Sequence, residues 1–393
     1  MRYILKILTV PVLLTFVCTA SIAQQKTVDL EHLNYTVEED TDWTNLFIRQ
    51  SGWFGADGIY AIPMDGARSK GGRKSSKNMF IFSDSMIGEI DSGKLKPGYT
   101  MVHNTVAYIT GDDPLQTNIT FSWAENSAGK PQSLFSPHTA TAKQGDYYWL
   151  GDGFYNQATK KTYIFAYRMH NTDAKEDWSF KQMADDIIIL PKGSKAPFKD
   201  QVQVETPLHY ESGTSKNDGS YGAGIFVNTK EAGAPNPDGY VYVYGNRGRG
   251  LVASRVLPQD FENFSTWRFW DGQAWNADMQ KAAILTTDIS DELSLSPLPD
   301  GRYILVFQLG GMSNDVAMRI GASPIGPFGP VIKLYDAKLS NKRYFHYNAK
   351  AHPSLSEPGE LLITYNQNSF DFWHQLILNP NLYHPYFLKL KFN

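Results

Sequence analysis

Two aspartates stand at the ends of adjacent strand-like segments, where their carboxyl groups can act on one ligand. Asp57 comes directly before the run Gly58–Pro63, and Asp84 closely follows the apolar run Met79–Phe82. If these runs pair as the two strands of a hairpin, both side chains lie at the same rim of a sheet. A pair of carboxyl groups is the minimum equipment for acid/base cleavage of a glycosidic bond.

Other polar residues stand near the starts of further strands that the sequence predicts. In a ring of sheets the innermost strand of each sheet lines a central channel, and its start lies near the mouth where ligands bind. Two carboxyl groups in different environments acquire separated pKa values, so that one serves as acid and the other as base, and a third tunes them by charge repulsion. Residues near the starts of the predicted innermost strands are therefore candidates. Besides Asp57, they are Asp152 with Trp149, Tyr221, Asp291 with Glu292, and Asn348 with His352.

Most of these candidates also have an ordinary structural explanation. Asp57–Gly58 and Asp152–Gly153 are common turn pairs, and Asp84 can cap a loop through an Asx-turn. Glu292 stands in a polar stretch typical of a solvated loop, and His352 can be a hydrogen-bonded core histidine. Residue type alone leaves both explanations open.

His103 and Asn104 are harder to explain by structure alone. They lie inside the apolar run Met101–Val106. Polar side chains embedded in a strand need hydrogen-bonding partners, and a ligand pocket would supply them. We therefore add both residues to the candidate binding residues.

The elements that must position these residues are almost entirely strands. A short aromatic or β-branched strand follows a turn signal five times, about 60 to 80 residues apart, which suits four-stranded blades with inserted loops. We predict an all-β fold, a five-bladed β-propeller; a two-layer sandwich is the alternative, but it does not explain five similar units. The repeated strands are 78–82, 161–167, 238–244, 300–307 and 358–365, and the strands expected before them are 57–63, 146–150, 221–228, 293–297 and 349–354.

The C-terminal segment Pro385–Phe392 alternates like an edge strand. We expect it to share the last blade with the first segment of the mature chain and so to close the ring. The segment Ser323–Pro330 predicts a rigid turn between blades, and the basic segment Ser69–Lys77 predicts an exposed hairpin insertion. No linker divides the chain, so residues 24–393 are predicted to form a single domain.

Residues 1–23 have the pattern of a secretory signal peptide. Arg2 and Lys6 precede the apolar run Ile7–Val17, and Ser21–Ala23 offers small residues for cleavage. The apolar run is short for a membrane span. The sequence therefore predicts an exported protein, periplasmic or extracellular, without a membrane span.

The composition of the chain excludes several classes of function. Cys18 is the only cysteine, so the predicted mature chain has no disulfide, thiol nucleophile or cysteine-held metal and depends on its core for stability. Net charge is −3 without a basic block, which argues against a nucleic-acid partner. The chain has no phosphate-binding loop, His-Glu-x-x-His run or nucleophile elbow. We expect no required cofactor or metal, a monomer, and at most a structural Ca²⁺ for which no loop signature is present.

An ordered set of motifs resembles a known family. The motifs are Gly55–Gly58, Phe82–Ser85, Met101–Thr105, Tyr221–Ala223, Gly239–Gly245, Gly326–Phe328, Asn348–Pro353 and Ile363–Asn366. Together, over about residues 45 to 392, they resemble a secreted bacterial family, long catalogued as a domain of unknown function, that includes endo-D-arabinanases. Its members are five-bladed propellers related in architecture to arabinanase and invertase-like glycoside hydrolases.

The resemblance implies hydrolysis of furanosidic or related bonds of a polysaccharide. Asp57 matches one motif acid and is expected to be the general base or nucleophile; Asp84 matches the other and is expected to be the partner acid or an orienting group. Asp152 and Glu292 are weaker candidates for the remaining acid. The expected substrate-binding residues are Trp53, His103, Asn104, Trp149, Tyr221, Asn348, His352, Tyr365 and Asn366.

Two other functions remain open from the sequence. One is a propeller that binds carbohydrate without cleaving it. The other is a polysaccharide lyase that uses His103 or His352 as its base. The basic segment after Gly66 lies outside the motif pattern of the family and leaves the substrate range open.

Overall fold

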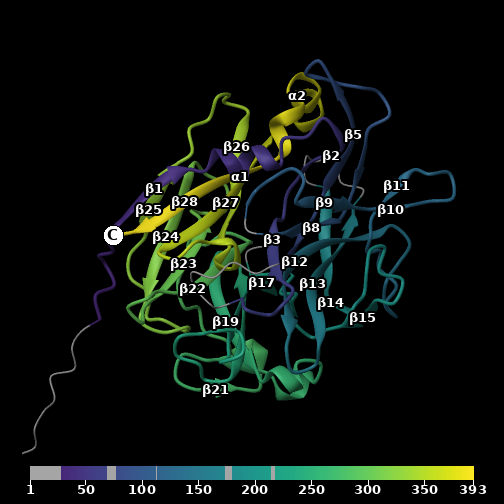
Figure 1. Ribbon diagram of the computed structural model, residues 1–393. Helices are drawn as coiled ribbons and strands as arrows, with labels where there is room; N and C mark the ends of the chain where they lie inside the picture. Colours follow the sequence, from purple (N-terminus) through teal and green to yellow (C-terminus); the bar gives the residue numbers. More distant parts are fainter. Residues whose placement is uncertain (1–27, 69–76, 112, 173–178, 214–216) are drawn as a thin grey trace, which may run out of the picture.

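The computed structural model describes residues 28–68, 77–111, 113–172, 179–213 and 217–393 (Figure 1). The predicted signal peptide and, apart from Lys77, the basic insertion lie outside these residues, so both stay predictions. Within the described ranges strands dominate, and the two α-helices, α1 (Thr41–Leu46) and α2 (Phe372–Leu378), are short. The all-β prediction is confirmed.

Five antiparallel sheets follow one another along the chain, and we number them in that order. Sheet 1 is β3 (Tyr60–Pro63), β4 (Lys77–Phe82), β8 (Thr105–Thr110) and β9 (Ile119–Ser122). Sheet 2 is β12 (Asp146–Asn156), β13 (Lys161–Asn171), β14 (Phe180–Leu190) and β15 (Val202–Glu205). Sheet 3 is β16 (His209–Tyr210), β17 (Gly219–Asn228), β18 (Tyr240–Arg247), β19 (Gly250–Val256), β20 (Arg268–Trp270) and β21 (Trp275–Asn276).

Sheets 4 and 5 complete the series. Sheet 4 is β22 (Leu293–Pro297), β23 (Tyr303–Gln308), β24 (Asp315–Gly321) and β25 (Ile332–Asp336). Sheet 5 is β26 (Tyr344–Ala351), β27 (Glu360–Ser369), β28 (Pro385–Phe392) and, from the other end of the chain, β1 (Tyr35–Glu39). The pairing of β28 with β1 runs from Tyr35 opposite Phe392 to Glu39 opposite Leu388, which confirms the predicted closure by the C-terminal strand.

The inner strands of the five sheets stand around a common centre. β3 contacts β12, β12 contacts β17, β17 contacts β22, and β22 contacts β26. The last and first sheets meet where the Lys350 ammonium of β26 lies 4.6 Å from the ring centroid of Tyr60 in β3. Figure 1 shows β3, β12, β17 and β22 in the middle of the molecule and β15 and β25 toward its outside.

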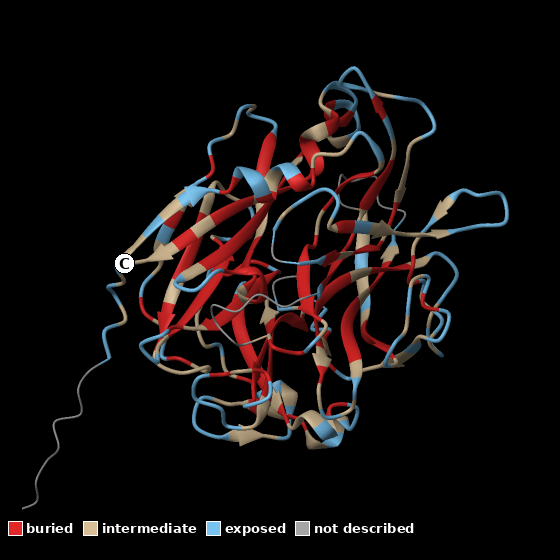
Figure 2. Ribbon diagram, in the orientation of Figure 1, coloured by how far each residue is buried: buried red, intermediate tan, exposed pale blue. Residues whose placement is uncertain are grey.

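Each gap between neighbouring sheets is filled by its own apolar cluster. Because both faces of these sheets are covered, the buried residues run along the middle strands, whereas loops and α1 are more exposed (Figure 2). Complete burial of one such side chain contributes about 1.5–3 kcal/mol, so the clusters hold the ring together. Members from both sides of the gaps are Ile81 with Ile164, Phe165 with Val243, Phe226 with Leu305, Val306 with Ile363, and Phe80 with Phe387.

Two local predictions were wrong. The segment Ser323–Pro330 joins β24 to β25 within sheet 4 rather than two sheets to each other. The strand expected at 349–354 ends at Ala351, and a short 3₁₀ helix, Pro353–Leu355, follows it. Proline lacks the N–H that a strand ladder needs, but it suits the first turn of a helix.

A further sheet was not foreseen from the sequence. It consists of β2 (Ser51–Ala56), β5 (Ser85–Asp91), β6 (Lys94–Leu95) and β7 (Thr100–Val102). A small hairpin, β10 (Ala124–Glu125) with β11 (Pro131–Gln132), forms a separate two-stranded sheet, and β11 contacts β7. β2 precedes β3 and β5 follows β4, so this sheet prolongs the first hairpin of sheet 1 beyond Asp57 and Asp84.

Candidate active site

The predicted hairpin exists, and its two aspartates lie at a break in it. β3 pairs with β4 on one side of the break, and β2 pairs with β5 on the other. The backbone N–H of Asp57 donates to the carbonyl of Asp84 at 3.2 Å, and that of Ser83 donates to the carbonyl of Asp57 at 2.9 Å. Gly58 has a φ of +62° and faces Ser83 so closely that a Cβ would clash. The aspartates are therefore held between two sheets and not at free strand tips.

Asp57 is a carboxyl group with few charge-stabilising partners. Its Oδ2 accepts a hydrogen bond of 2.8 Å from the Tyr347 hydroxyl. Burial raises the pKa of Asp57 to about 8, and the negative charges of Asp84 and Glu292 act in the same direction, against the hydroxyls of Tyr347 and Tyr383. At neutral pH this carboxyl group is mostly protonated.

Asp84 is bound by an oriented histidine. The Nδ1 of His103 lies 2.9 Å from Asp84 Oδ1, and the histidine side chain is 34% exposed. Because a carboxylate only accepts, Nδ1 is assigned as the donor. The imidazole stacks on the ring of Tyr147 with centroids 3.9 Å apart, and the His103 N–H donates to the Ser133 hydroxyl at 2.9 Å. Asp84 thus has a histidine as its hydrogen-bond donor, whereas the described side-chain donor of Asp57 is a tyrosine hydroxyl.

Glu292 brings a third carboxyl group, from the segment just before β22. Its Oε1 accepts from the Asn348 amide at 2.8 Å, and its Oε2 lies 2.6 Å from the Lys350 ammonium. Burial raises the pKa of Glu292, while Lys350 opposes that shift. Since the charge of Glu292 raises the pKa of Asp57, the two carboxyl groups are electrostatically coupled.

A bulge in β26 orients the side chains that contact Asp57 and Glu292. The register of β26 against β27 shifts between Tyr347 and Lys350. Asn348, within this bulge, has a φ of 62°, a left-handed conformation uncommon for residues other than glycine. Bulges re-aim side chains, and here neighbouring residues contact Asp57 and Glu292 respectively.

Asp152 is close to Glu292, whose pKa it raises by its charge, but it is fully engaged. It forms an ion pair with Arg68, and its oxygens accept from the N–H groups of Gly153 and Ile225, each at 2.8 Å. The residue is 1% exposed. Asp152 therefore ties β12 to β17 and to the segment after β3.

Three of the expected binding residues are partly exposed near the acids. His103 and Asn348 contact Asp84 and Glu292, as described above. Trp149 lies in β12, with its ring 6.0 Å from Tyr147 and edge-on to Phe180 at 4.7 Å. These residues can meet a ligand at the acids.

The other six expected binding residues are buried. Trp53 stacks on Phe121, Tyr221 faces Tyr210, and Tyr365 stacks on Tyr386. Asn104 bonds to the backbone of Phe135 and Tyr148, which answers the need for partners noted from its sequence. His352 contacts the Thr364 hydroxyl at 2.7 Å, and Asn366 donates to the carbonyl of Ala56 at 3.2 Å. The structure places these six in the core.

Sequence reasoning missed Tyr347, Tyr383, Lys350 and Arg68. Tyr347 and Lys350 lie within two positions of the predicted residue Asn348, and this closeness in sequence was the signal that could have identified them. Arg68 directly precedes the basic segment Ser69–Lys77, and nothing in its sequence distinguishes it from the basic residues of that segment. Tyr383 lies in the 3₁₀ helix Pro380–Tyr383, which no strand pattern indicates.

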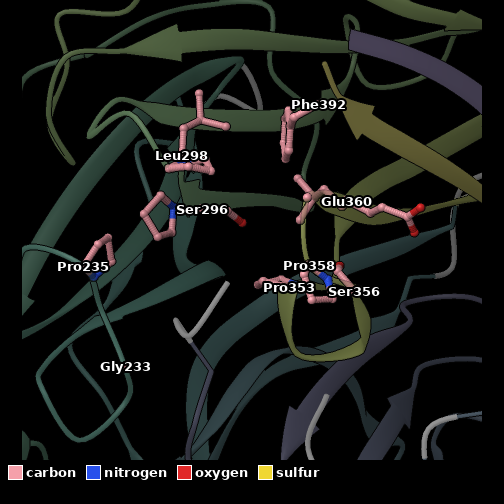
Figure 3. A pocket seen from close by; sticks show the side chains of 13 residues that line it. Gly233, Pro235, Ser296, Leu298, Pro353, Ser356, Pro358, Glu360 and Phe392 are labelled. Carbon is pink, nitrogen blue, oxygen red and sulfur yellow. The ribbon is translucent and has the colours of Figure 1, made fainter. Parts of the chain in front are cut away.

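A hollow lies in another part of the molecule. It has a volume of about 300 Å³ and is lined mainly by proline and apolar residues, among them Pro297, Leu298 and Phe392 (Figure 3). Pro297 ends β22, whereas Glu292 precedes that strand, so the hollow lies at the opposite end. Its lining includes a single carboxylate, Glu360. The hollow therefore lacks the paired acids that define the candidate site.

Neither a metal cluster nor a membrane helix occurs in the described part of the chain. Within those residues no group of three or more His, Cys, Asp and Glu side chains could hold a metal ion. In the same ranges no helix has the length and apolar character needed to cross a bilayer.

The model of the domain of unknown function DUF5005 matches residues 40–392. The chain belongs to the DUF5005 family. No curated protein sequence is significantly similar to it. Since the family carries no assigned activity, the DUF5005 match leaves the resemblance to endo-D-arabinanases a prediction.

Solved structures resemble the DUF5005 chain over most of its length. A “putative hydrolase” from Bacteroides ovatus ATCC 8483 has a TM-score of 0.67 at 19% identity, covering 94% of this chain and 97% of that one. An α-L-arabinofuranosidase from Podospora anserina has a TM-score of 0.47 at 11% identity, covering 91% and 97%. The catalytic domain of a GH62 α-L-arabinofuranosidase from Coprinopsis cinerea has a TM-score of 0.45 at 10% identity, covering 92% and 97%. At such identities the first likeness concerns the fold alone.

Proposed function

We propose that this DUF5005 protein is an exported glycoside hydrolase that cleaves a polysaccharide with the Asp57–Asp84 pair. The observation that carries the proposal is the contrast within that pair: Asp57 has a pKa of about 8, whereas Asp84 is bound by His103. Carboxyl groups whose environments differ in this way divide the roles of acid and base.

In this proposal Asp57 is the general acid, which reverses the role expected from the family resemblance. Its proton passes to the glycosidic oxygen as the bond to the anomeric carbon breaks. Asp84 either takes a proton from the attacking water or attacks the anomeric carbon itself. His103 orients Asp84 through the hydrogen bond at Nδ1.

The substrate is proposed to be an arabinan or a related furanosidic polysaccharide. The motif resemblance supports this choice. Tyr147 stacks on His103 with Trp149 beside it, and Asn348 bonds to Glu292, so aromatic and amide groups that suit sugar rings and hydroxyls lie next to the partners of the acids. The chain is further proposed to be a monomeric five-bladed propeller, with sheets 1 to 5 as its blades and residues 24–393 as one domain, and to need no cofactor.

The proposal is tested by replacing each acid of the pair. Purified protein should release reducing ends from at least one member of a panel of arabinans and other polysaccharides. Asp57→Asn and Asp84→Asn should each lower turnover about 10²–10⁴-fold, the range of general acid–base catalysis, and leave the circular dichroism spectrum unchanged. The control is Asp113→Asn, an exposed loop aspartate, which should retain full activity. Turnover retained by both acid variants would refute the proposal.

A second candidate is a lyase, and the His103–Asp84 contact favours it. A histidine whose Nδ1 is held by a carboxylate is suited to act as a base through its other nitrogen. A lyase would release unsaturated products that absorb in the ultraviolet, and His103→Gln would abolish their formation. A hydrolase releases saturated products only. The absorbance of the products therefore separates the two candidates.

A further inference from the structure

One lysine is buried at the centre of the ring of sheets. The side chain of Lys350 is 1% exposed. Its ammonium lies 2.6 Å from Glu292 Oε2, donates to the Asn348 carbonyl at 2.9 Å, and lies 4.6 Å from the ring centroid of Tyr60. A buried ammonium is costly unless it is paired, and each of these contacts compensates part of that cost.

Lys350 is the cation that faces Glu292. Asp291 and Asp152, both negative, also act on Glu292. Each of these has an arginine of its own, because Asp291 pairs with Arg249 and Asp152 with Arg68. The charge balance at Glu292 therefore depends on Lys350.

Glu292 in turn acts on Asp57. The groups that face Asp57 come from four places in the fold: Asp84 between β4 and β5, Tyr347 on β26, Tyr383 in its 3₁₀ helix, and Glu292 before β22. The two tyrosines favour the ionised form of Asp57, and the two acids favour its protonated form. Loss of charge at Glu292 would shift that balance.

We propose that Lys350 is a positioning residue: it holds Glu292 in the ionised form beside the β26 bulge whose consecutive residues Tyr347 and Asn348 contact Asp57 and Glu292, and the charge of Glu292 adds to burial and Asp84 in favouring the protonated form of Asp57. This inference rests on the proposed function, in which Asp57 donates that proton. Lys350 contacts neither Asp57 nor, in this proposal, the substrate. Its influence passes through the Glu292 carboxylate.

The direction of the effect follows from charge. Without Lys350, the buried Glu292 is no longer paired and takes up a proton. The negative charge near Asp57 then disappears, so the pKa of Asp57 falls and its proton is lost at a lower pH. Glu292→Gln removes the same charge directly and must shift the pKa in the same direction.

The experiment follows the Asp57 carboxyl group by NMR in protein labelled with carboxyl-¹³C aspartate. The Asp57 signal is assigned by its absence from Asp57→Asn. In Lys350→Met and in Glu292→Gln the titration of Asp57 should move to lower pH by roughly one unit, a tenfold change in proton affinity. Lys350→Arg keeps the cation and should leave the titration near that of the unaltered protein.

The double variant Lys350→Met/Glu292→Gln guards against loss of folding, because it leaves no unpaired charge behind. It should show the same fall in the pKa of Asp57. An unshifted titration in the double variant, or a shift in Lys350→Met without one in Glu292→Gln, would overturn the inference. This readout needs no turnover. A shifted pKa of Asp57 together with a fully active Asp57→Asn would instead refute the proposed function. The effect of Lys350 on Asp57 through Glu292 would still be supported.

Discussion

Asp57 and Asp152 carry the same sequence signature and have opposite surroundings. Each is followed by glycine and stands on or beside an inner strand. Asp152 has Arg68 and two backbone N–H groups at its oxygens. Asp57 has the Tyr347 hydroxyl and, as neighbours, two further acids. Burial raises the pKa of both carboxyl groups, but Arg68 and two N–H groups oppose the shift at Asp152, whereas Asp84 and Glu292 add to it at Asp57.

The difference separates a structural aspartate from a chemical one. An aspartate whose oxygens are occupied by an arginine and two backbone N–H groups has no open position for a ligand. A carboxyl group kept protonated by burial and like charges is poised to donate, although folding must tolerate it. The comparison therefore predicts that removing the two side chains has opposite effects on stability.

The largest effect is expected at Asp152. Asp152→Ala leaves the Arg68 guanidinium without its carboxylate and two buried N–H groups without acceptors. Breaking a buried ion pair from one side typically costs about 3–5 kcal/mol. Denaturant unfolding at pH 7 should show a loss of that size, against less than about 0.5 kcal/mol for Asp113→Ala at the surface. A loss as small as the control's would mean that Asp152 does not hold the sheets together.

A smaller effect of opposite sign is expected at Asp57. Its pKa is about 8 in the folded protein and near 3.8 when unfolded. The folded state therefore binds the extra proton between these values, and stability falls as the pH rises from about 4 to 8. Asp57→Asn has no proton to lose, so it should be more stable than the unaltered protein at pH 8 by about 1–3 kcal/mol, since each pKa unit corresponds to about 1.4 kcal/mol.

The measurement is denaturant unfolding of both proteins at pH 5 and pH 8. The advantage of Asp57→Asn should be larger at pH 8 than at pH 5. Asp113→Asn, measured alongside, should match the stability of the unaltered protein at both pH values. An advantage that is constant with pH, or a loss of stability at pH 8, would show that Asp57 is not held protonated.

The ring of strands could be predicted because its signals are local. Aromatic and β-branched runs after turns marked the strands, and the alternation of Pro385–Phe392 marked the closing strand. The pairing of Asp57 with Asp84 followed from the hairpin that joins them. These inferences needed only neighbouring residues.

The faces of the inner strands could not be predicted in this way. Strands covered on both sides lack the polar alternation that reveals a solvent face. Trp53 and Tyr365 were therefore expected to stack on sugars, yet both lie in apolar clusters. The contacts of Tyr347 and Lys350 depend on the bulge at Asn348. The Tyr347 contact also joins β26 to Asp57, which lies far away in the sequence. Only the three-dimensional arrangement brings these residues together.

The smallest effect, and the finest test of the comparison, is expected at Tyr347. Its hydroxyl bonds to Asp57 at 2.8 Å and lowers the pKa of that carboxyl group, against the combined effect of burial and the acids. Tyr347→Phe removes one hydrogen bond to a charged group, worth about 1.5–3 kcal/mol at most. The pKa of Asp57 should rise by roughly one unit, so the alkaline limb of the activity profile should move to higher pH.

This shift is opposite in sign to that expected for Lys350→Met, although both residues lie on β26. Tyr365→Phe, which alters a buried tyrosine of the neighbouring strand β27, is the matched control and should leave the profile in place. If Tyr347→Phe moved the limb to lower pH, the hydroxyl would be stabilising the protonated form of Asp57. The predicted direction of the Tyr347 effect on the pKa of Asp57 would then be refuted.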